Sequence, residues 1–157
     1  GMTGCYCPNH GCIDNAIHTF AGVQLRLECA ALMEAQGYPE PTGRAKVTDA
    51  FNLPARFIVH TVGPIANGAA SATDARLLAN CYKSCLDAAA ELGCSSIAFC
   101  CISTGVFGFP QEAAAAIAID AVHVWLDSHD SGTHVIFNVF TDRDERIYHG
   151  LLFDAAR

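Results

Sequence analysis

The sequence has few basic residues and no cluster of them. Its 157 residues include nine Lys and Arg against sixteen Asp and Glu, a formal net charge of −7. A protein that binds duplex nucleic acid presents a basic patch, so we expect no nucleic-acid partner. The sequence also lacks an apolar run of about 20 residues, the length that crosses a bilayer. No basic segment leads into an apolar one at its start, so we expect neither a membrane span nor a signal peptide.

Apolar residues and cysteines are abundant instead. Apolar residues make up 52% of the chain, enough for the core of one domain, and we predict a single domain over residues 1–157. Five of the nine cysteines fall within apolar helix or strand patterns, where thiols are typical small core side chains. We therefore expect a reducing, cytoplasmic setting. These five are Cys29, Cys81, Cys85, Cys100 and Cys101.

The most informative stretch runs from Ser95 to Ala116. Its uncharged apolar run, Ile97–Ile102, predicts a strand buried on both faces. A loop with two glycines follows, over residues 103–109, and Pro110 suits the first position of a helix that lasts to about His129. This arrangement presents backbone N–H groups and the positive end of a helix to an anion, most often a phosphate. The alternative is that the two glycines only make turns.

The rest of the chain alternates apolar strands with amphipathic helices, which indicates an α/β fold with helices on both faces of a mostly parallel sheet. Ligands of such sheets lie beyond the carboxyl ends of the strands, so the loops after residues 102 and 140 should face one crevice. The other predicted elements are a helix over Ile13–Gln36 ended by Gly37, an edge strand over Arg44–Ala50, a buried strand over Phe57–Val62, a helix from the N-cap Thr73 to Leu92, a buried strand over His134–Phe140, and a helix over Arg143–Ala155 capped by Thr141 and Asp142.

Four potential metal ligands lie close together near the start: Cys5, Cys7, His10 and Cys12. Thiolate and imidazole groups at such short spacing are the ligands that tetrahedral zinc prefers. A loop rich in Pro, Gly and Asn can bring them to one ion. The alternative is a flexible leader with cysteines there by chance.

Three other polar residues lie near this loop or in a predicted strand. Asp14 falls in the first turn of a predicted helix, where a carboxylate either interacts with the helix dipole or is held at the mouth of the metal loop. His18 lies one turn further on the same face, and we favour a packed surface residue over a supporting role for Asp14. His60 lies inside a predicted strand, and we favour a core or sheet-edge histidine.

Four segments together resemble the macrodomain, a module that binds ADP-ribose. They extend, in a shared order, over nearly the whole chain: CIDNAIHTFAG, FIVHTVGP, CISTGVFGFPQEAA and VIFNVFTDRDERIY. The start, GCYCPNHGCIDNAIHTFAGVQLR, resembles the zinc-dependent microbial macrodomains that hydrolyse protein-linked ADP-ribose. The resemblance implies a three-layer α/β/α fold with a mixed sheet.

The resemblance also implies site residues. The zinc ligands would be Cys5, His10 and Cys12, although spacing leaves Cys7 as an alternative to Cys5. Asp14 would have a catalytic or substrate-positioning role. The residues implied to bind ADP-ribose are Ile13 and Asn15 in the first substrate loop, Ser103, Thr104, Gly105, Val106, Phe107 and Gly108 around the diphosphate and distal ribose, Asn138 near the proximal ribose and Phe140 against the adenine.

One departure from the family concerns two strands. A macrodomain normally begins with two further strands, and the second would lie between the strands predicted at Phe57–Val62 and Ile97–Ile102. We expect that these two strands pair directly or that a second chain, for example in a homo-oligomer, fills the gap. The expected function is zinc-dependent removal of ADP-ribose from modified proteins. The alternatives are a binding module without catalysis, an inactive fragment of a longer enzyme, and a zinc ion that only stabilises the loop at residues 1–12.

Overall fold

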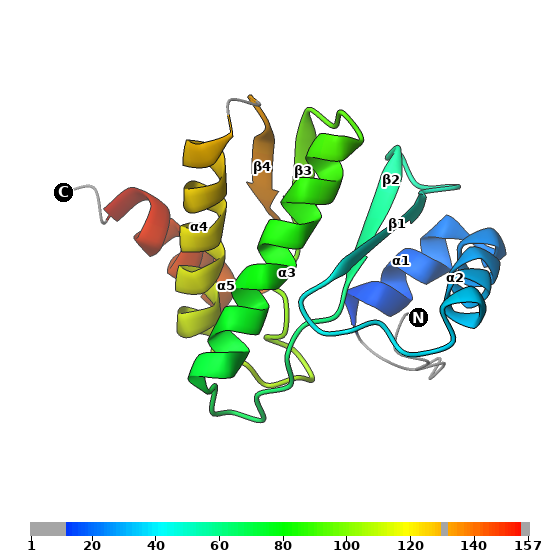
Figure 1. The fold of residues 1–157 in the computed structure, drawn as a ribbon. Coiled ribbons are helices and arrows are strands. Elements are labelled where there is room, and N and C mark those ends of the chain that lie inside the picture. Colours follow the sequence, from blue (N-terminus) through cyan, green and yellow to red (C-terminus); the bar gives the residue numbers. More distant parts are fainter. Residues whose placement is uncertain (1–11, 130–131, 155–157) are drawn as a thin grey trace.

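The structure is a computed structural model that describes residues 12–129 and 132–154. Helices and short strands alternate along the chain (Figure 1). The elements are α1 (Ile13–Ala21), α2 (Val23–Gln36), β1 (Ala45–Asp49), β2 (Phe57–Thr61), α3 (Ala72–Glu91), β3 (Ser96–Phe99), α4 (Gln111–Ser128), β4 (His134–Phe137), α5 (Asp142–His149) and the π-helical turn η1 (Gly150–Asp154).

The described strands form two separate pairs. Strands β1 and β2 are antiparallel, with Val47 opposite Val59, and β3 and β4 are parallel, with Ile97 opposite Val135. The predicted α/β class is confirmed. The expectation of a single, mostly parallel sheet is not met, because β2 and β3 share no backbone ladder.

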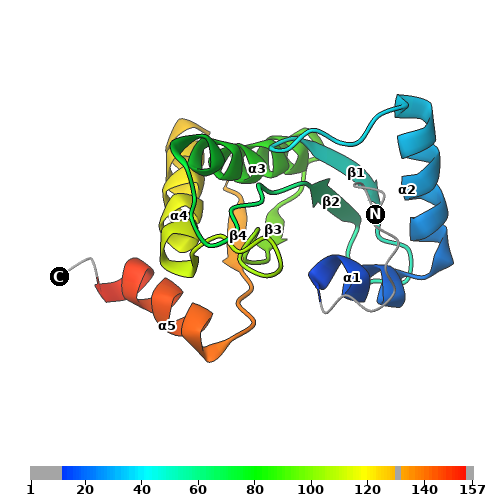
Figure 2. The same ribbon diagram turned by 90° about the horizontal axis from the view of Figure 1, so that it is seen from below.

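Helix α3 spans both strand pairs. It contacts β1, β2 and β3, and Figures 1 and 2 show β2 and β3 as the facing strands of the two pairs. Each of these two strands has a ladder on one edge only. Of the two expected arrangements, direct pairing of β2 with β3 is therefore wrong for the described structure.

The main core lies between α3, α4 and the second strand pair. Helix α3 contributes Tyr82 and Leu86, α4 contributes Trp125, and β3 contributes Phe99, whose ring centroid is 4.9 Å from that of Tyr82. Phe109, 2% exposed, joins this core from the end of the loop after β3. Burying an aromatic side chain of this size stabilises a fold by about 1.5–3 kcal/mol, so Phe109 fixes one end of that loop.

The helix predicted over Ile13–Gln36 is interrupted at Gly22. The backbone there has φ 94° and ψ 179°, which separates α1 from α2. A Cβ at this position would lie 2.8 Å from Asn52 Nδ2, and Asn52 N donates to Ala21 O at 3.3 Å. The repeat of apolar residues continues through the break because Ala21 and Leu25 enter the same small core. Periodicity alone therefore missed the bend.

Several predicted boundaries also differ. Ser71 rather than Thr73 caps α3, since its hydroxyl accepts from Asp74 N in a capping box. Pro110 is the N-cap of α4 and not its first residue. Strands β3 and β4 are shorter than predicted and alternate in exposure, with Ala98 and Ile136 exposed, so they are not buried on both faces. Helix α5 begins at Asp142 and gives way to η1.

The predicted core residues are largely confirmed. Cys29, Cys81 and Cys85 are buried, Cys100 and Cys101 are half-buried, and every cysteine among the described residues is a free thiol. Burial raises the pKa of the Cys81 and Cys85 thiols. Within the described ranges, no helix is both long enough and apolar enough to cross a bilayer.

His60 is a core histidine, as predicted. It is 8% exposed and its Nε2 lies 2.9 Å from Thr48 Oγ1 on β1 and 4.0 Å from the Cys29 thiol on α2. Burial lowers the pKa of His60 from 6.5 to about 4, partly opposed by the negative charge of Asp14. His60 is therefore neutral in the fold at neutral pH.

The free energy of unfolding should fall on acidification because of His60. Between its unfolded pKa of 6.5 and its folded pKa of about 4, the unfolded chain binds a proton that the folded chain does not. Stability should decrease as the pH falls through that range, by roughly 3 kcal/mol in total. Urea denaturation at a series of pH values measures this. His60→Gln should flatten the dependence, whereas His123→Gln on an exposed face of α4 should not. Equal slopes for both variants would contradict the assignment.

Candidate functional site

The loop after β3 is a compact turn held by its own backbone. Phe109 N donates to Ser103 O at 3.0 Å, and Gly108 N donates to Gly105 O at 2.9 Å. Thr104 Oγ1 donates to Cys101 O at 3.0 Å. Gly105 and Val106 at its tip are exposed, so the tip of the predicted diphosphate loop is accessible to a ligand.

A second loop holds this one in place. Ala66 N and Asn67 N both donate to Phe107 O, at 2.8 and 3.1 Å, and Gly68 N donates to Gly108 O at 2.8 Å. A Cβ on Gly108, where φ is +63°, would lie 3.1 Å from Gly68 N. No role was predicted for residues 66–68. The signal available there was a run of small residues next to a Gly-Pro pair.

Ser103 has a special conformation in this loop. Its φ of 67° lies in the left-handed region, which is uncommon for a residue with a side chain. Its Oγ is buried and makes no hydrogen bond to any described residue. Gly63, just after β2, packs directly against Ser103, because a Cβ there would lie 2.1 Å from Ser103 Oγ. The position of Ser103, the first residue of the loop, therefore depends on its contact with Gly63 at the end of the neighbouring strand.

Helix α4 starts immediately after the loop. Its N-terminus carries free backbone N–H groups and a partial positive charge, both of which favour an anion. Its first residues, Gln111 and Glu112, contact α5 through side-chain bonds of 2.7 Å to Asp144 and Arg143. The phosphate site at this loop and helix start stays a prediction.

The loop between β4 and α5 holds two more of the predicted ligand-binding residues, Asn138 and Phe140. Asn138 N continues the parallel ladder by donating to Phe99 O at 2.7 Å. Phe140 is 97% exposed, as expected for a ring that packs against a ligand instead of the core. Thr141 then caps α5 through a capping box with Asp144.

Asp14 lies in the first turn of α1, between Ile13 and Asn15. Its side chain is 54% exposed. His18, predicted as a packed surface residue, is instead buried, with 3% of its surface exposed, so that prediction is wrong. Its Nε2 is 3.6 Å from Asp14 Oδ1, and neither ring nitrogen hydrogen-bonds to a described residue. Burial lowers the pKa of His18, and the charge of Asp14 partly opposes this. Asp14 therefore has an imidazole on its inner side and solvent on its outer side.

The predicted metal ligands are only partly visible. Cys5, Cys7 and His10 lie outside the described residues, so the zinc site stays a prediction. Cys12 is the N-cap of α1, a half-buried free thiol two residues before Asp14. Cysteine sulfur is a common zinc ligand, so Cys12 fits the role of a ligand. Within residues 12–129 and 132–154, no three His, Cys, Asp or Glu side chains form a metal site.

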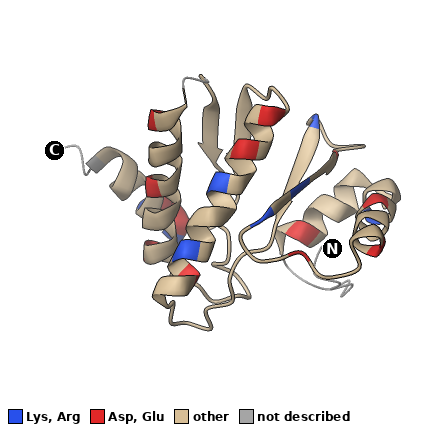
Figure 3. Ribbon diagram, viewed as in Figure 1, with Lys and Arg blue, Asp and Glu red and all other residues tan. Residues whose placement is uncertain are grey.

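These segments lie at one edge of the fold. Figure 1 shows the loops after β2 and β3 along the lower edge, with β4 pointing toward it, and Figure 2 views that edge from below with the start of α1 beside the loop after β3. Figure 3 shows Lys and Arg spread over several elements and not gathered on one. The loops that were expected to face one crevice therefore share one edge of the fold.

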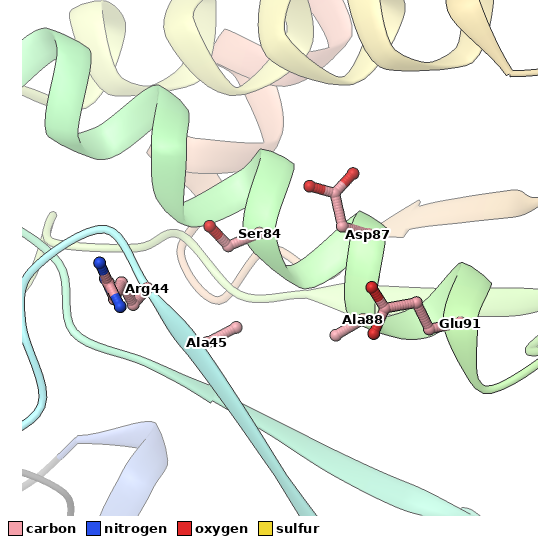
Figure 4. Close-up of a pocket in the computed structure, with 6 residues that line it drawn as sticks. All are labelled: Arg44, Ala45, Ser84, Asp87, Ala88 and Glu91. Atoms are coloured by element: carbon pink, nitrogen blue, oxygen red, sulfur yellow. The ribbon is translucent and has the colours of Figure 1, made fainter.

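A cavity elsewhere is separate from this edge. It has a volume of about 280 Å³ and lies between β1 and α3 (Figure 4). Asp87 in its wall already accepts from Trp125 Nε1 at 2.8 Å and Lys83 Nζ at 2.6 Å. No predicted site residue contributes to this cavity, which is lined by Arg44, Ala45, Ser84, Asp87, Ala88 and Glu91.

Comparison with known proteins identifies the family. A family model described as Macro domain matches residues 3–118. The chain belongs to the macro domain family, and its α/β architecture is the macrodomain fold. The predicted family is thereby confirmed.

Among the relatives is a protein named protein-ADP-ribose hydrolase from Treponema medium, 57% identical over 152 residues, which cover 97% of this chain and 58% of that protein. A protein of the same name from Staphylococcus aureus strain MRSA252 is 53% identical over 146 residues, 92% of this chain and 55% of that protein. The chain thus spans a little over half the length of these relatives.

Solved structures agree with the family. The Oceanobacillus iheyensis macrodomain with ADP is 41% identical with a TM-score of 0.85, over 94% of this chain and 77% of that one. The Trypanosoma brucei macrodomain in complex with ADP-ribose is 34% identical with a TM-score of 0.79, over 93% of this chain and 59% of that one.

Proposed function

We propose that this chain carries the ADP-ribose-binding and hydrolytic site of a zinc-dependent protein-ADP-ribosyl hydrolase. The observation that carries the proposal is that the start of α1 lies at the same edge as the loop after β3 (Figure 2). The first turn of α1 carries Asp14, which is backed by the buried His18. Relatives of 53–57% identity with the name protein-ADP-ribose hydrolase support it.

The protein residues would act by binding and orienting the substrate. Backbone N–H groups of the loop over residues 103–108 would hold the diphosphate. Ile13 and Asn15 would flank the distal ribose, Asn138 would approach the proximal ribose, and Phe140 would pack against the adenine. The loop is held through Phe107 and Gly108 before any ligand arrives, so little order is lost on binding.

Asp14 would act at the bond between the distal ribose and the modified protein. Water adds to the ribose carbon, the bond to the protein side chain breaks, and that side chain leaves with a proton. Asp14 would orient the water or take its proton. A zinc ion held by Cys12, His10 and Cys5 or Cys7 would, when bound, lower the pKa of a coordinated water or hydroxyl.

Metal removal tests the enzyme against its alternatives. We expect turnover of an ADP-ribosylated protein to fall at least about tenfold after chelation and to return with zinc. The binding of free ADP-ribose, followed by calorimetry, is the control and should change less. Binding of ADP-ribose without any turnover would favour a reader module. The absence of both binding and turnover would indicate an inactive fragment. If zinc only stabilises the predicted metal loop at residues 1–12, Cys12→Ala should unfold that loop, while Asp14→Ala should leave turnover unchanged.

The unpaired edges of β2 and β3 support a proposal about assembly. A second chain, such as another copy of this one, would supply the strand that pairs with them, because exposed strand edges are templates for pairing. Light scattering over a concentration series measures the oligomeric state. A monomer at all concentrations would exclude the homo-oligomer.

A reducing, cytoplasmic setting remains part of the proposal, supported by the free thiols of Cys81 and Cys85.

A further inference from the structure

Helices α4 and α5 are joined by a hydrogen bond at their first turns. Gln111 Nε2 donates to Asp144 Oδ1 at 2.7 Å. Asp144 is only 6% exposed, so its carboxylate depends on protein donors rather than water. A buried carboxylate oxygen that loses its donor costs more than an exposed one, because no solvent replaces the bond.

The other oxygen of Asp144 holds the cap of α5. Its Oδ2 accepts from Thr141 Oγ1 at 2.6 Å and from Thr141 N at 3.3 Å, while Thr141 Oγ1 accepts from Asp144 N at 3.1 Å. One carboxylate therefore connects the capping residue of α5 to the first residue of α4. The packing of Tyr148 against Ala115 and Ile119 holds the same two helices together further along.

The two joined residues each follow a predicted ligand-binding loop. Gln111 comes two residues after Phe109, which closes the loop over residues 103–109, and Thr141 directly follows Phe140. The ring of Phe140 is 97% exposed, so its position depends on its backbone and thus on the Thr141 cap. Within the proposed function, we propose that Gln111 is a positioning residue that, through Asp144, fixes the adenine-binding side of the site relative to the diphosphate loop.

A neighbouring contact provides a matched control. Arg143 Nη2 donates to Glu112 Oε1 at 2.7 Å across the same two helices. Both of these side chains are about 60% exposed. Exposed ion pairs contribute little because water replaces the lost interaction. Glu112→Gln therefore weakens a contact between α4 and α5 without touching the buried carboxylate.

The test compares Gln111→Met, which keeps the length and loses the donor, with Gln111→Lys, which restores a donor to Asp144. Calorimetry should show the affinity for ADP-ribose about tenfold weaker in the Met variant and within about twofold of the parent in the Lys and Glu112→Gln variants. Ribose 5-phosphate, which lacks adenosine, should bind with equal affinity to the parent chain and to all three variants, as measured by its competition with ADP-ribose. Amide exchange at Phe140–Asp142 should accelerate only in the Met variant, with no ligand present.

Equal losses for both ligands, or an unchanged Met variant, would overturn the inference. So would unchanged amide exchange at Phe140–Asp142, and that result needs no ligand. Failure of the parent chain to bind ADP-ribose overturns the proposed function directly, while faster exchange in the Met variant would still establish the structural link. The two failures are therefore distinguishable.

Discussion

Gly63→Ala is expected to weaken ADP-ribose binding by about 10–100-fold, because a displacement of about 1 Å in a binding group has effects of this size. The new Cβ would lie 2.1 Å from Ser103 Oγ and 2.8 Å from Ile102 Cγ2. The serine hydroxyl can rotate away, but Ile102 is in the main core and cannot. The loop must therefore shift at its first residue. Overpacking of this kind also lowers the free energy of unfolding by about 1–3 kcal/mol.

Calorimetry and urea denaturation on the same samples measure both effects of Gly63→Ala. Gly150→Ala is the matched control, since nothing lies within 4 Å of its Cβ and its φ of −59° is helical. Alanine there should be neutral or stabilising by up to about 1 kcal/mol. If the affinity of Gly63→Ala for ADP-ribose stayed within twofold of the parent, the contact of Gly63 with Ser103 and Ile102 would not determine the position of the loop.

Asp14→Asn should lower turnover of an ADP-ribosylated protein by about 100-fold or more, the usual contribution of a positioned acid–base group. Asparagine keeps the shape but cannot take a proton. Because the Asp14 side chain is 54% exposed, the fold should survive, with a loss of at most about 1 kcal/mol from the helix dipole. Binding of free ADP-ribose should change by less than about threefold, since the diphosphate loop is untouched.

Single-turnover kinetics with titration of free ADP-ribose separate these effects of Asp14→Asn. Asp49→Asn, an exposed change at the end of β1, is the control and should leave both measurements unchanged. If Asp14→Asn lost binding and turnover in parallel, Asp14 would be a ligand-binding residue and not a catalytic one.

Much of the candidate site could be read from local signals. The loop at residues 103–109 was predictable because an apolar strand, two glycines and a proline follow one another in sequence. Phe140 was placed at the adenine by the family resemblance and not by a local signal, and that role stays a prediction. The role of residues 66–68 and the depth of His18 were not predictable, because each depends on segments distant in sequence. His18 has the same spacing from Asp14 whether it faces solvent or the core.

The sequence by itself determined the helix and strand types, the buried cysteines and the order of the segments that mark the family. Each of these follows from apolar periodicity or from short-range turn chemistry, which neighbouring residues decide. Only the tertiary structure decided the bend at Gly22, the separation of β2 from β3, and the Gln111–Asp144 bond between α4 and α5. These features depend on which distant backbone and side-chain groups meet, and no periodicity along the chain encodes that meeting.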